Sequence, residues 1–173
     1  MSVLFSPVTV GPVEFANRAW VPPMCQYSAV DGVFQQWHGV HYASMVIGGY
    51  GLVMVEASAV LPEGRITPWC LGLWNDEQAD VVSHVPEFAH QYGVKAGIQL
   101  AHAGRKASTD APWRGGKPLS ADQGGWQSIG PSAVPFEGYP VPREMSHDDI
   151  DAVIAAFVAA AGRAVAAGFD VIE

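Results

Sequence analysis

Short apolar runs alternate with amphipathic segments along most of the chain. Val8, Val10, Val13 and Phe15 alternate around Gly11-Pro12, a pattern that predicts a β-hairpin over residues 1–16. A brief apolar strand follows at 18–22, and Pro22-Pro23 ends it. Three further runs are apolar without alternation, which is typical of strands buried on both faces of a parallel sheet: 52–56, 95–100 and 169–172.

Helical periodicity occupies the intervals between these runs. Residues 36–47 have helical spacing and end at Gly48-Gly49, and a second helix begins at Asn75 or Asp76 and continues to about Tyr92. Pro86 should kink that helix or divide it in two. Ser146 and Asp149 resemble a capping box. After it, seven apolar residues fall on one predicted helical face: Ile150, Val153, Ile154, Phe157, Val158, Ala161 and Val165.

The order of elements favours a parallel α/β fold. After the hairpin, strands and helices alternate, except that residues 101–143 show no period, as in a loop that serves function or is disordered. An open Rossmann sheet would carry a G-x-G-x-x-G turn after its first strand, whereas Pro-Pro-Met-Cys-Gln-Tyr stands there. The pattern therefore predicts a TIM (βα)₈ barrel with right-handed crossovers.

The length of the chain limits how much of a barrel it can form. A complete TIM barrel needs eight strands and about 250 residues, whereas the chain has 173 residues and four predicted barrel strands. We therefore expect residues 1–173 to be the N-terminal half of a single barrel domain, with the C-terminal half absent. Three or four strands leave sheet edges and an apolar inner face bare. A complementary C-terminal half, or a second half-barrel, would cover them.

Composition excludes several classes of protein. A net charge of −8, from 9 basic and 17 acidic residues, argues against a nucleic-acid or anionic-membrane surface. No apolar run approaches the roughly 20 residues of a membrane span, and MSVLFSPVTVG does not resemble a signal peptide. The two cysteines, Cys25 and Cys70, are too few for a disulfide framework. We expect a reduced, cytoplasmic protein.

Unusual polar residues follow the predicted strands, at the edge where barrel enzymes place their reactive groups. They bring together a thiol, a phenol, an amide and cations. Backbone amides and Gln99 can hydrogen-bond a flat heteroaromatic ligand, and Tyr27 can hydrogen-bond a carbonyl. The residues at these strand ends are Pro22, Pro23, Met24, Cys25, Gln26 and Tyr27, then Glu56, Ala57 and Ser58, then Gln99, His102, Arg105 and Lys106.

Several strings in this region resemble one enzyme family. The chain is similar to the old yellow enzymes, FMN-dependent ene-reductases, and most of all to their cysteine-containing, xenobiotic-reductase-like branch. The resemblance covers the whole chain in order. The strings that carry it are PPMCQYSA-x-DG at 22–32, VEASAV-x-PEGRIT at 55–67, GIQLAHAGRKAS at 97–108, GPSAV at 130–134, VPREMS-x-DDI at 141–150 and AAGFDVIE at 166–173.

The resemblance implies a flavoprotein oxidoreductase with a ping-pong cycle. NADPH or NADH would reduce FMN, and the reduced flavin would pass hydride to the activated C=C bond of an α,β-unsaturated carbonyl compound. Carried over by motif, Pro23, Met24, Ala57 and Gln99 would bind the isoalloxazine. Cys25 would lie beside its reactive edge and tune its potential. Tyr27 would hold the substrate carbonyl, and Ile66 would line the substrate pocket.

The resemblance also implies missing parts. The family's paired His or His/Asn substrate anchor and its Tyr proton donor would lie beyond the position of Glu173, together with most of the phosphate site. We therefore expect this polypeptide alone to be inactive, and the complete enzyme to be a homo-oligomer. The alternative is a non-catalytic half-barrel fragment that self-assembles. Another barrel enzyme, such as an aldolase, is disfavoured because no Schiff-base lysine is expected on a strand.

Plainer interpretations remain for single residues. From composition alone, Cys25 is a buried thiol, and Cys70 has no supporting motif and is interpreted as structural. His38 and His41 have no third ligand nearby, so we expect no metal site. His102, Arg105 and Lys106 either contact a phosphate or order a loop through ion pairs with carboxylates. The Trp residues between 69 and 126 line a lid, cover a core or form an interface.

Overall fold

Four parallel strands form the main sheet of the computed structural model, which describes residues 2–173. They lie side by side in chain order: β3 (Trp20–Val21), β4 (Leu52–Ala59), β5 (Lys95–Ala101) and β8 (Val171–Ile172). An open doubly wound sheet reverses its strand order at a switch point, whereas this sheet adds each new strand on the same side. That order is the order of a TIM barrel.

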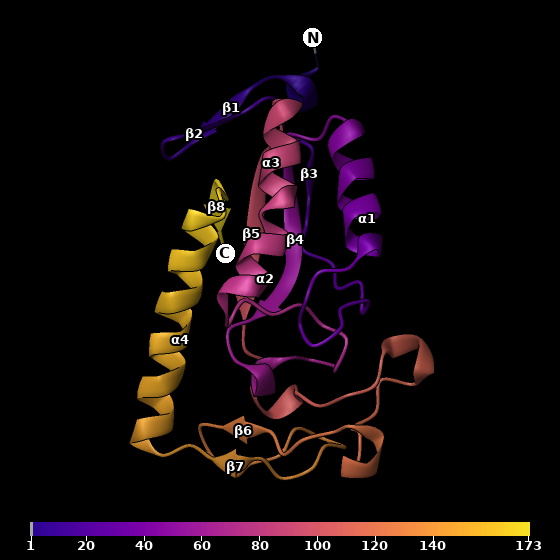
Figure 1. The fold of residues 1–173 in the computed structure, drawn as a ribbon, viewed down its shortest axis with the longest axis vertical. Helices are drawn as coiled ribbons and strands as arrows, with labels where there is room; N and C mark the ends of the chain where they lie inside the picture. Colours follow the sequence, from indigo (N-terminus) through magenta and orange to yellow (C-terminus); the bar gives the residue numbers. More distant parts are fainter. Residues whose placement is uncertain (1) are drawn as a thin grey trace.

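Helices connect the strands and cover one face of the sheet (Figure 1). The prediction that Pro86 divides the second helix is confirmed, since one helix ends before Ser83 and another begins after it. The Asn75 side chain caps the former by accepting from the Gln78 N–H at 2.9 Å. The helices are α1 (Gln36–Ile47), α2 (Asp76–Val82), α3 (His84–Gln91) and α4 (His147–Ala166).

The two faces of the sheet bury different residues. Val53, Val55 and Ile98 face the helices and belong to the main core, while Leu52 and Met54 belong to a second cluster. That second cluster also contains Phe15 of the predicted hairpin, which forms as β1 (Val8–Val10) and β2 (Val13–Phe15). The hairpin therefore lies against the inner face, at the end of the sheet where its strands begin (Figure 1).

The predicted apolar face of α4 is only partly correct. The capping box forms, with the Asp149 N–H donating to Ser146 Oγ at 3.2 Å. The helix contacts the core through small residues, with Ala160 and Ala164 fully buried. Ile154, Val158 and Val165 remain 57%, 68% and 66% exposed. Small side chains allow the helix to approach the sheet closely, and this rotates the larger residues outward.

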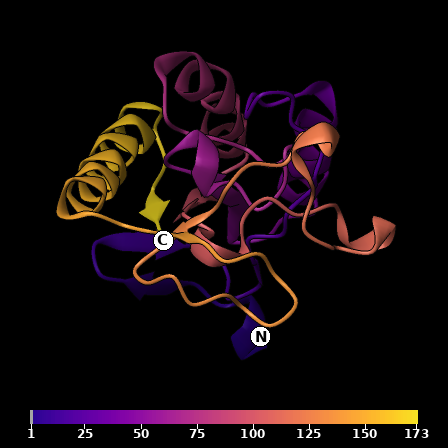
Figure 2. The same ribbon diagram turned by 90° about the horizontal axis from the view of Figure 1, so that it is seen from below.

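The segment between β5 and α4 is irregular, as the lack of periodicity predicts. It contains three 3₁₀ turns and only the short strands β6 (Ile129–Gly130) and β7 (Arg143–Glu144), which pair in parallel. It runs beneath the sheet, beside the ends of the barrel strands (Figures 1 and 2). The 3₁₀ turns are η3 (Gly104–Lys106), η4 (Pro112–Arg114) and η5 (Ala121–Gln123); two others occur earlier, η1 (Val3–Phe5) and η2 (Pro62–Gly64).

The sheet has two open edges within residues 2–173. β3 and β8 each pair on one side only, as expected for part of a barrel. Across the same residues, no helix has the length and apolar character needed to cross a lipid bilayer.

Candidate functional site

The predicted site residues lie on consecutive parts of one edge of the sheet. Parallel register aligns Val21 of β3 with Val53 of β4, and Val53 with Ala96 of β5, so these strands end on the same side. We call this edge, with loops 22–35 and 60–75, the rim. It lies in the lower half of Figure 1, opposite the hairpin. The rim carries Pro23, Met24, Cys25 and Tyr27 after β3, Ala57 near the end of β4, Ile66 beyond it, and Gln99 on β5.

An irregularity in β4 joins two of these segments. The pairing of β4 with β5 shifts between Val55 and Ser58, which frees the backbone of Ala57 from the regular ladder. The Ala57 N–H donates to the Cys25 thiol instead. Next to it, the Gln26 N–H donates to Glu56 Oε2 at 3.0 Å. Loop 22–27 is therefore held to the end of β4 through adjacent residues.

Glu56, at the end of β4, is a further functional candidate, and the motifs of the sequence assign it no role. Its side chain is fully buried with those of His38 and Tyr42 of α1. The Glu56 N–H donates to the Tyr42 hydroxyl oxygen at 3.0 Å, and His38 Nε2 lies 3.4 Å from Glu56 Oε1. His38 Nδ1 accepts from the Gln35 N–H at 3.0 Å, so the ring proton is on Nε2, which forms no hydrogen bond within residues 2–173. The signal was an acidic residue in an otherwise apolar run.

Cys70 lies beside Cys25. No sequence motif indicates this pairing. Both are free thiols, and hydrogen bonding between them shifts their pKa values in opposite directions. That bond and burial raise the pKa of Cys25 well above its ordinary value, and the nearby Glu56 carboxylate adds to the effect. The bond from Cys25, with further bonds from Thr67, lowers the pKa of Cys70 to about 7. Cys70 is therefore the thiol of the pair that ionises first.

Tyr27 has an unusual backbone. Its φ of 52° lies in the left-handed region, which a bulky residue seldom adopts without a structural or functional constraint. Its ring meets the Trp113 ring edge-on, with centroids 5.2 Å apart. Burial, and then the neighbouring Cys25, raise the pKa of Tyr27, so its hydroxyl stays protonated and can donate a hydrogen bond at neutral pH.

Gln99 lies on the inner face of the sheet. Its neighbours on β5, Ile98 and Ala96, are fully buried on the helix side, so alternation places Gln99 on the other side. Its amide nitrogen donates to Glu173 Oε1 at 2.6 Å, and the Glu173 N–H donates to the Ile98 oxygen at 3.0 Å. The Gln99 side chain is therefore oriented by the residue that follows β8, and its amide oxygen accepts no hydrogen bond from any residue in the range 2–173.

Two of the three candidates after β5 contact the loop that follows them. Arg105 donates to the Val134 carbonyl oxygen at 3.2 Å, and the Lys106 ammonium lies 4.2 Å from the centre of the Phe136 ring. Burial lowers the pKa of His102. Within residues 2–173, Arg105 and Lys106 therefore form a carbonyl and an aromatic contact and no ion pair with a carboxylate, while the alternative of a phosphate contact stays a prediction.

Tryptophans hold the loops of the rim together. The Arg65 guanidinium lies between two of them, 5.4 Å from the centre of the Trp74 ring and 5.2 Å from that of Trp126. Next to it, the Ile66 oxygen accepts from both the N–H and the hydroxyl of Thr109, at 2.9 and 3.1 Å. Ile66 is therefore fixed against the long loop after β5.

The rim offers what a flavin ring system requires. An isoalloxazine presents a flat apolar face, acceptors along its pyrimidine and central rings, and one N–H donor. Met24 is 45% exposed, and the backbone N–H groups of Met24 and Cys25 donate to no protein group among residues 2–173. With the available oxygen of Gln99, the rim combines an apolar surface, donors and an acceptor. The residues present fit this cofactor.

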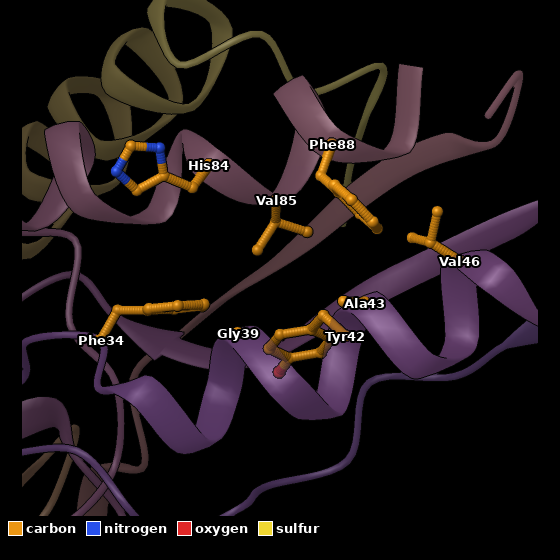
Figure 3. A pocket seen from close by; sticks show the side chains of 8 residues that line it. All are labelled: Phe34, Gly39, Tyr42, Ala43, Val46, His84, Val85 and Phe88. Carbon is orange, nitrogen blue, oxygen red and sulfur yellow. The ribbon is translucent and has the colours of Figure 1, made fainter. Parts of the chain in front are cut away.

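A separate apolar groove lies on the helix side of the sheet. It has a volume of about 220 Å³ and lies between α1 and α3 (Figure 3). None of the predicted site residues lines it, and its wall has few polar groups, with His84 at one end. We do not place the site there. The lining residues are Phe34, Gly39, Tyr42, Ala43, Val46, His84, Val85 and Phe88.

No metal site is built by the described residues: within 2–173, no group of three or more His, Cys, Asp or Glu is arranged to hold an ion. His38 and His41 both lie on α1, but their side chains contact different residues. His38 is fully buried against Glu56, whereas the His41 ring stacks on Trp37 with centroids 6.3 Å apart. Lys95, at the start of β5, is far from the rim and binds Asp170 at 2.9 Å.

A family model decides the relationship suggested by the motifs. The model of the NADH:flavin oxidoreductase / NADH oxidase family matches residues 3–173. The chain belongs to this family. The match begins before the hairpin and continues to the end of β8, so it includes every element of the rim.

Curated members of the NADH:flavin oxidoreductase family are similar along the whole chain. An NADH:flavin oxidoreductase of Gibberella zeae is 46% identical over 175 residues, covering 98% of this chain and 42% of that protein. An NADPH dehydrogenase of Geobacillus sp. is 42% identical, covering 99% of this chain and 47% of that protein. The chain therefore spans a little under half the length of these relatives.

Solved structures of the family have the same fold. Morphinone reductase superposes with a TM-score of 0.80 at 26% identity, covering 98% of this chain and 46% of that chain. The old yellow enzyme homologue of Zymomonas mobilis gives 0.80 at 27% identity, covering 99% and 47%. The resemblance to old yellow enzymes is confirmed, and the fold is the N-terminal half of their TIM barrel.

Proposed function

We propose that the rim is the N-terminal part of the FMN site of an NAD(P)H-dependent ene-reductase. The observation that carries this proposal is that Met24 and Cys25, whose backbone N–H groups donate to no protein group among residues 2–173, lie at the same end of the parallel sheet as the Gln99 amide. The activity belongs to the whole barrel, because the curated relatives are about twice as long as this chain.

In this proposal, the residues after β3 and β4 hold the ring system. Pro23 and Met24 pack on its face, the N–H groups of Met24 and Cys25 donate to its acceptors, and Ala57 lines the same side. Gln99, oriented by Glu173, contacts the pyrimidine end. When bound, FMN would supply the redox chemistry, which is hydride transfer from NADPH or NADH to the activated carbon–carbon double bond of an α,β-unsaturated carbonyl compound.

The remaining residues tune the reduction potential of the cofactor and bind the substrate. The Cys25 thiol lies at the reactive edge and stays protonated, because its hydrogen bond to Cys70 raises its pKa; a neutral sulfur there tunes the potential of the cofactor. The protonated Tyr27 hydroxyl donates to the substrate carbonyl, and Ile66 forms an apolar wall. Both cysteines are free thiols, which suits a reducing, cytoplasmic location.

A binding titration tests the proposal. Quenching of FMN fluorescence by the complete protein gives the Kd, and Gln99→Leu should raise it about tenfold by removing hydrogen bonds to the ring. Gln91→Leu, at the exposed end of α3, is the matched control and should leave the Kd unchanged. Equal affinity in all three proteins, or no FMN binding, would contradict the site. Oxidation of NADPH that depends on 2-cyclohexenone then tests the reaction.

A second candidate function rests on the open edges of the sheet. β3 and β8 each pair on one side only among residues 2–173, and such edges pair readily with another chain. In that case, residues 1–173 form a non-catalytic half-barrel that assembles with a second copy. Size-exclusion chromatography of this chain separates the two: a colourless dimer without NADPH oxidation supports self-assembly alone.

A further inference from the structure

The turn η4 presents an exposed tryptophan at the rim. Trp113 is 67% exposed. Its ring nevertheless contacts the Tyr27 ring edge to face, with centroids 5.2 Å apart and planes at 87°. Edge-to-face is a favoured geometry for aromatic pairs. The two rings therefore form an aromatic corner in which Trp113 stays largely exposed.

The base of this turn is firmly held. Ala111, just before it, is 1% exposed, and its oxygen accepts from the Gly116 N–H at 3.1 Å. The Asp110 N–H donates to the Lys117 oxygen at 2.9 Å, so the two ends of the turn are closed against each other. Trp113 is thus an exposed side chain on an anchored support.

Contacts on both sides tie the turn to the rim. Thr109 donates twice to the Ile66 oxygen, and the Arg114 guanidinium lies 5.0 Å from the centre of the Trp69 ring. The Trp69 oxygen in turn accepts from the Ala29 N–H at 2.9 Å, on the loop that carries Tyr27. The position of Trp113 relative to Tyr27 is therefore set by the two loops of the rim together.

We propose that Trp113 is a specificity-determining residue that, with Tyr27, selects substrates carrying a flat aromatic ring beside the activated double bond. This inference rests on the function proposed above. An aryl group that enters the corner covers the exposed indole face, while a small cyclic enone reaches the Tyr27 hydroxyl without touching Trp113.

Steady-state kinetics of the complete protein with two substrates test the proposal. Trp113→Ala should raise the KM for 4-phenyl-3-buten-2-one about tenfold, the order expected for a lost aromatic contact together with its buried area. Trp113→Phe should have a KM for this substrate close to that of the wild type. The kcat/KM for 2-cyclohexenone should stay within about twofold, since the small ring makes no contact with the indole.

A binding measurement supplies a readout that does not depend on turnover. The Kd of the saturated ketone 4-phenyl-2-butanone, from calorimetry, should rise about tenfold in Trp113→Ala and recover in Trp113→Phe. Tyr92→Ala is the matched control, because Tyr92 is a 55% exposed aromatic that also contacts a ring, Phe88, at the opposite end of the sheet. That variant should change neither substrate's KM nor the Kd.

The outcomes distinguish this inference from the proposed function. If the wild type reduces both enones and Trp113→Ala changes neither KM nor Kd, Trp113 has no part in specificity and the inference fails alone. If the KM values for both enones rise equally in Trp113→Ala, the effect is structural and the inference also fails. If the wild type reduces neither enone, the proposed function itself is wrong.

Discussion

The backbone N–H of Gln26 donates to Glu56 Oε2 at 3.0 Å, and this bond fixes the loop after β3 to the end of β4. Glu56 is buried, the Tyr42 hydroxyl donates to its Oε1 at 3.5 Å, and the buried His38 ring lies beside it. The carboxylate is therefore a fixed point from which the positions of Cys25 and Tyr27 follow.

Removing this carboxylate should destabilise the protein strongly. Glu56→Ala leaves the Gln26 N–H and the buried Tyr42 hydroxyl without their acceptor, and we expect a loss of about 2–4 kcal/mol in the free energy of unfolding. Glu56→Gln keeps an acceptor oxygen and should lose less. Urea denaturation measures both. Glu87→Ala, whose side chain is 69% exposed, is the control, and a Glu56→Ala loss no larger than the control's would contradict this role.

The two thiols should titrate as a pair. The Cys25 pKa is raised first of all by its bond to Cys70, so Cys70→Ala should shift the alkylation of Cys25 by iodoacetamide to lower pH. Cys25→Ala should have the opposite effect on Cys70, whose pKa of about 7 depends on the bond from Cys25. Peptide mapping after alkylation at several pH values follows each thiol. Unchanged profiles in both variants would show that the thiols are independent.

Asp170 should make stability depend on pH in the acid range. Burial raises its pKa, but bonds from His90, the Ala96 N–H and Lys95 outweigh burial, and the net pKa is lowered from 3.8. A lowered carboxyl pKa gives stability that is present above 3.8 and lost as pH falls through the folded-state value. Asp170→Asn should therefore cost about 1–2 kcal/mol at pH 7. The difference from wild type should shrink below 3.8, and a constant difference down to pH 2 would be inconsistent with this linkage.

Two glycines should respond to alanine in opposite directions. A Cβ at Gly51, just before β4, would collide with the Asn17 backbone oxygen, which cannot move freely. Gly51→Ala should therefore destabilise by about 2 kcal/mol. A Cβ at Gly162 in α4 meets nothing within 4 Å, so Gly162→Ala should stabilise by about 0.5–1 kcal/mol. Thermal unfolding compares the pair, and the same sign in both would contradict the packing described.

Local patterns predicted the elements well, because each depended on nearby residues. Continuous apolar runs marked β4 and β5, and Pro86 marked the division between α2 and α3. The outward rotation of Val158 was not predictable, since periodicity identifies an apolar face without saying which of its residues meet the sheet. Alanine spacing at Ala160 and Ala164 decided that question through close approach.

The sequence predicts which residues form the candidate site, but not which residues they contact. The sequence predicts three site residues, Cys25, Tyr27 and Gln99, because they lie at the ends of strands that finish on the same side of the sheet. Their partners were not predicted, because each lies far away in the chain: Cys70 beside Cys25, Glu173 beside Gln99, and Trp113 beside Tyr27. No motif encodes such a contact, which arises when parallel strands bring separate loops to one edge.

A crystal structure of the complete protein grown with FMN tests the central claim most directly. The account predicts the isoalloxazine on the face of Pro23 and Met24, accepting from the N–H groups of Met24 and Cys25, with the Gln99 amide at its pyrimidine end. A flavin bound elsewhere on the barrel, out of contact with both Cys25 and Gln99, would contradict it.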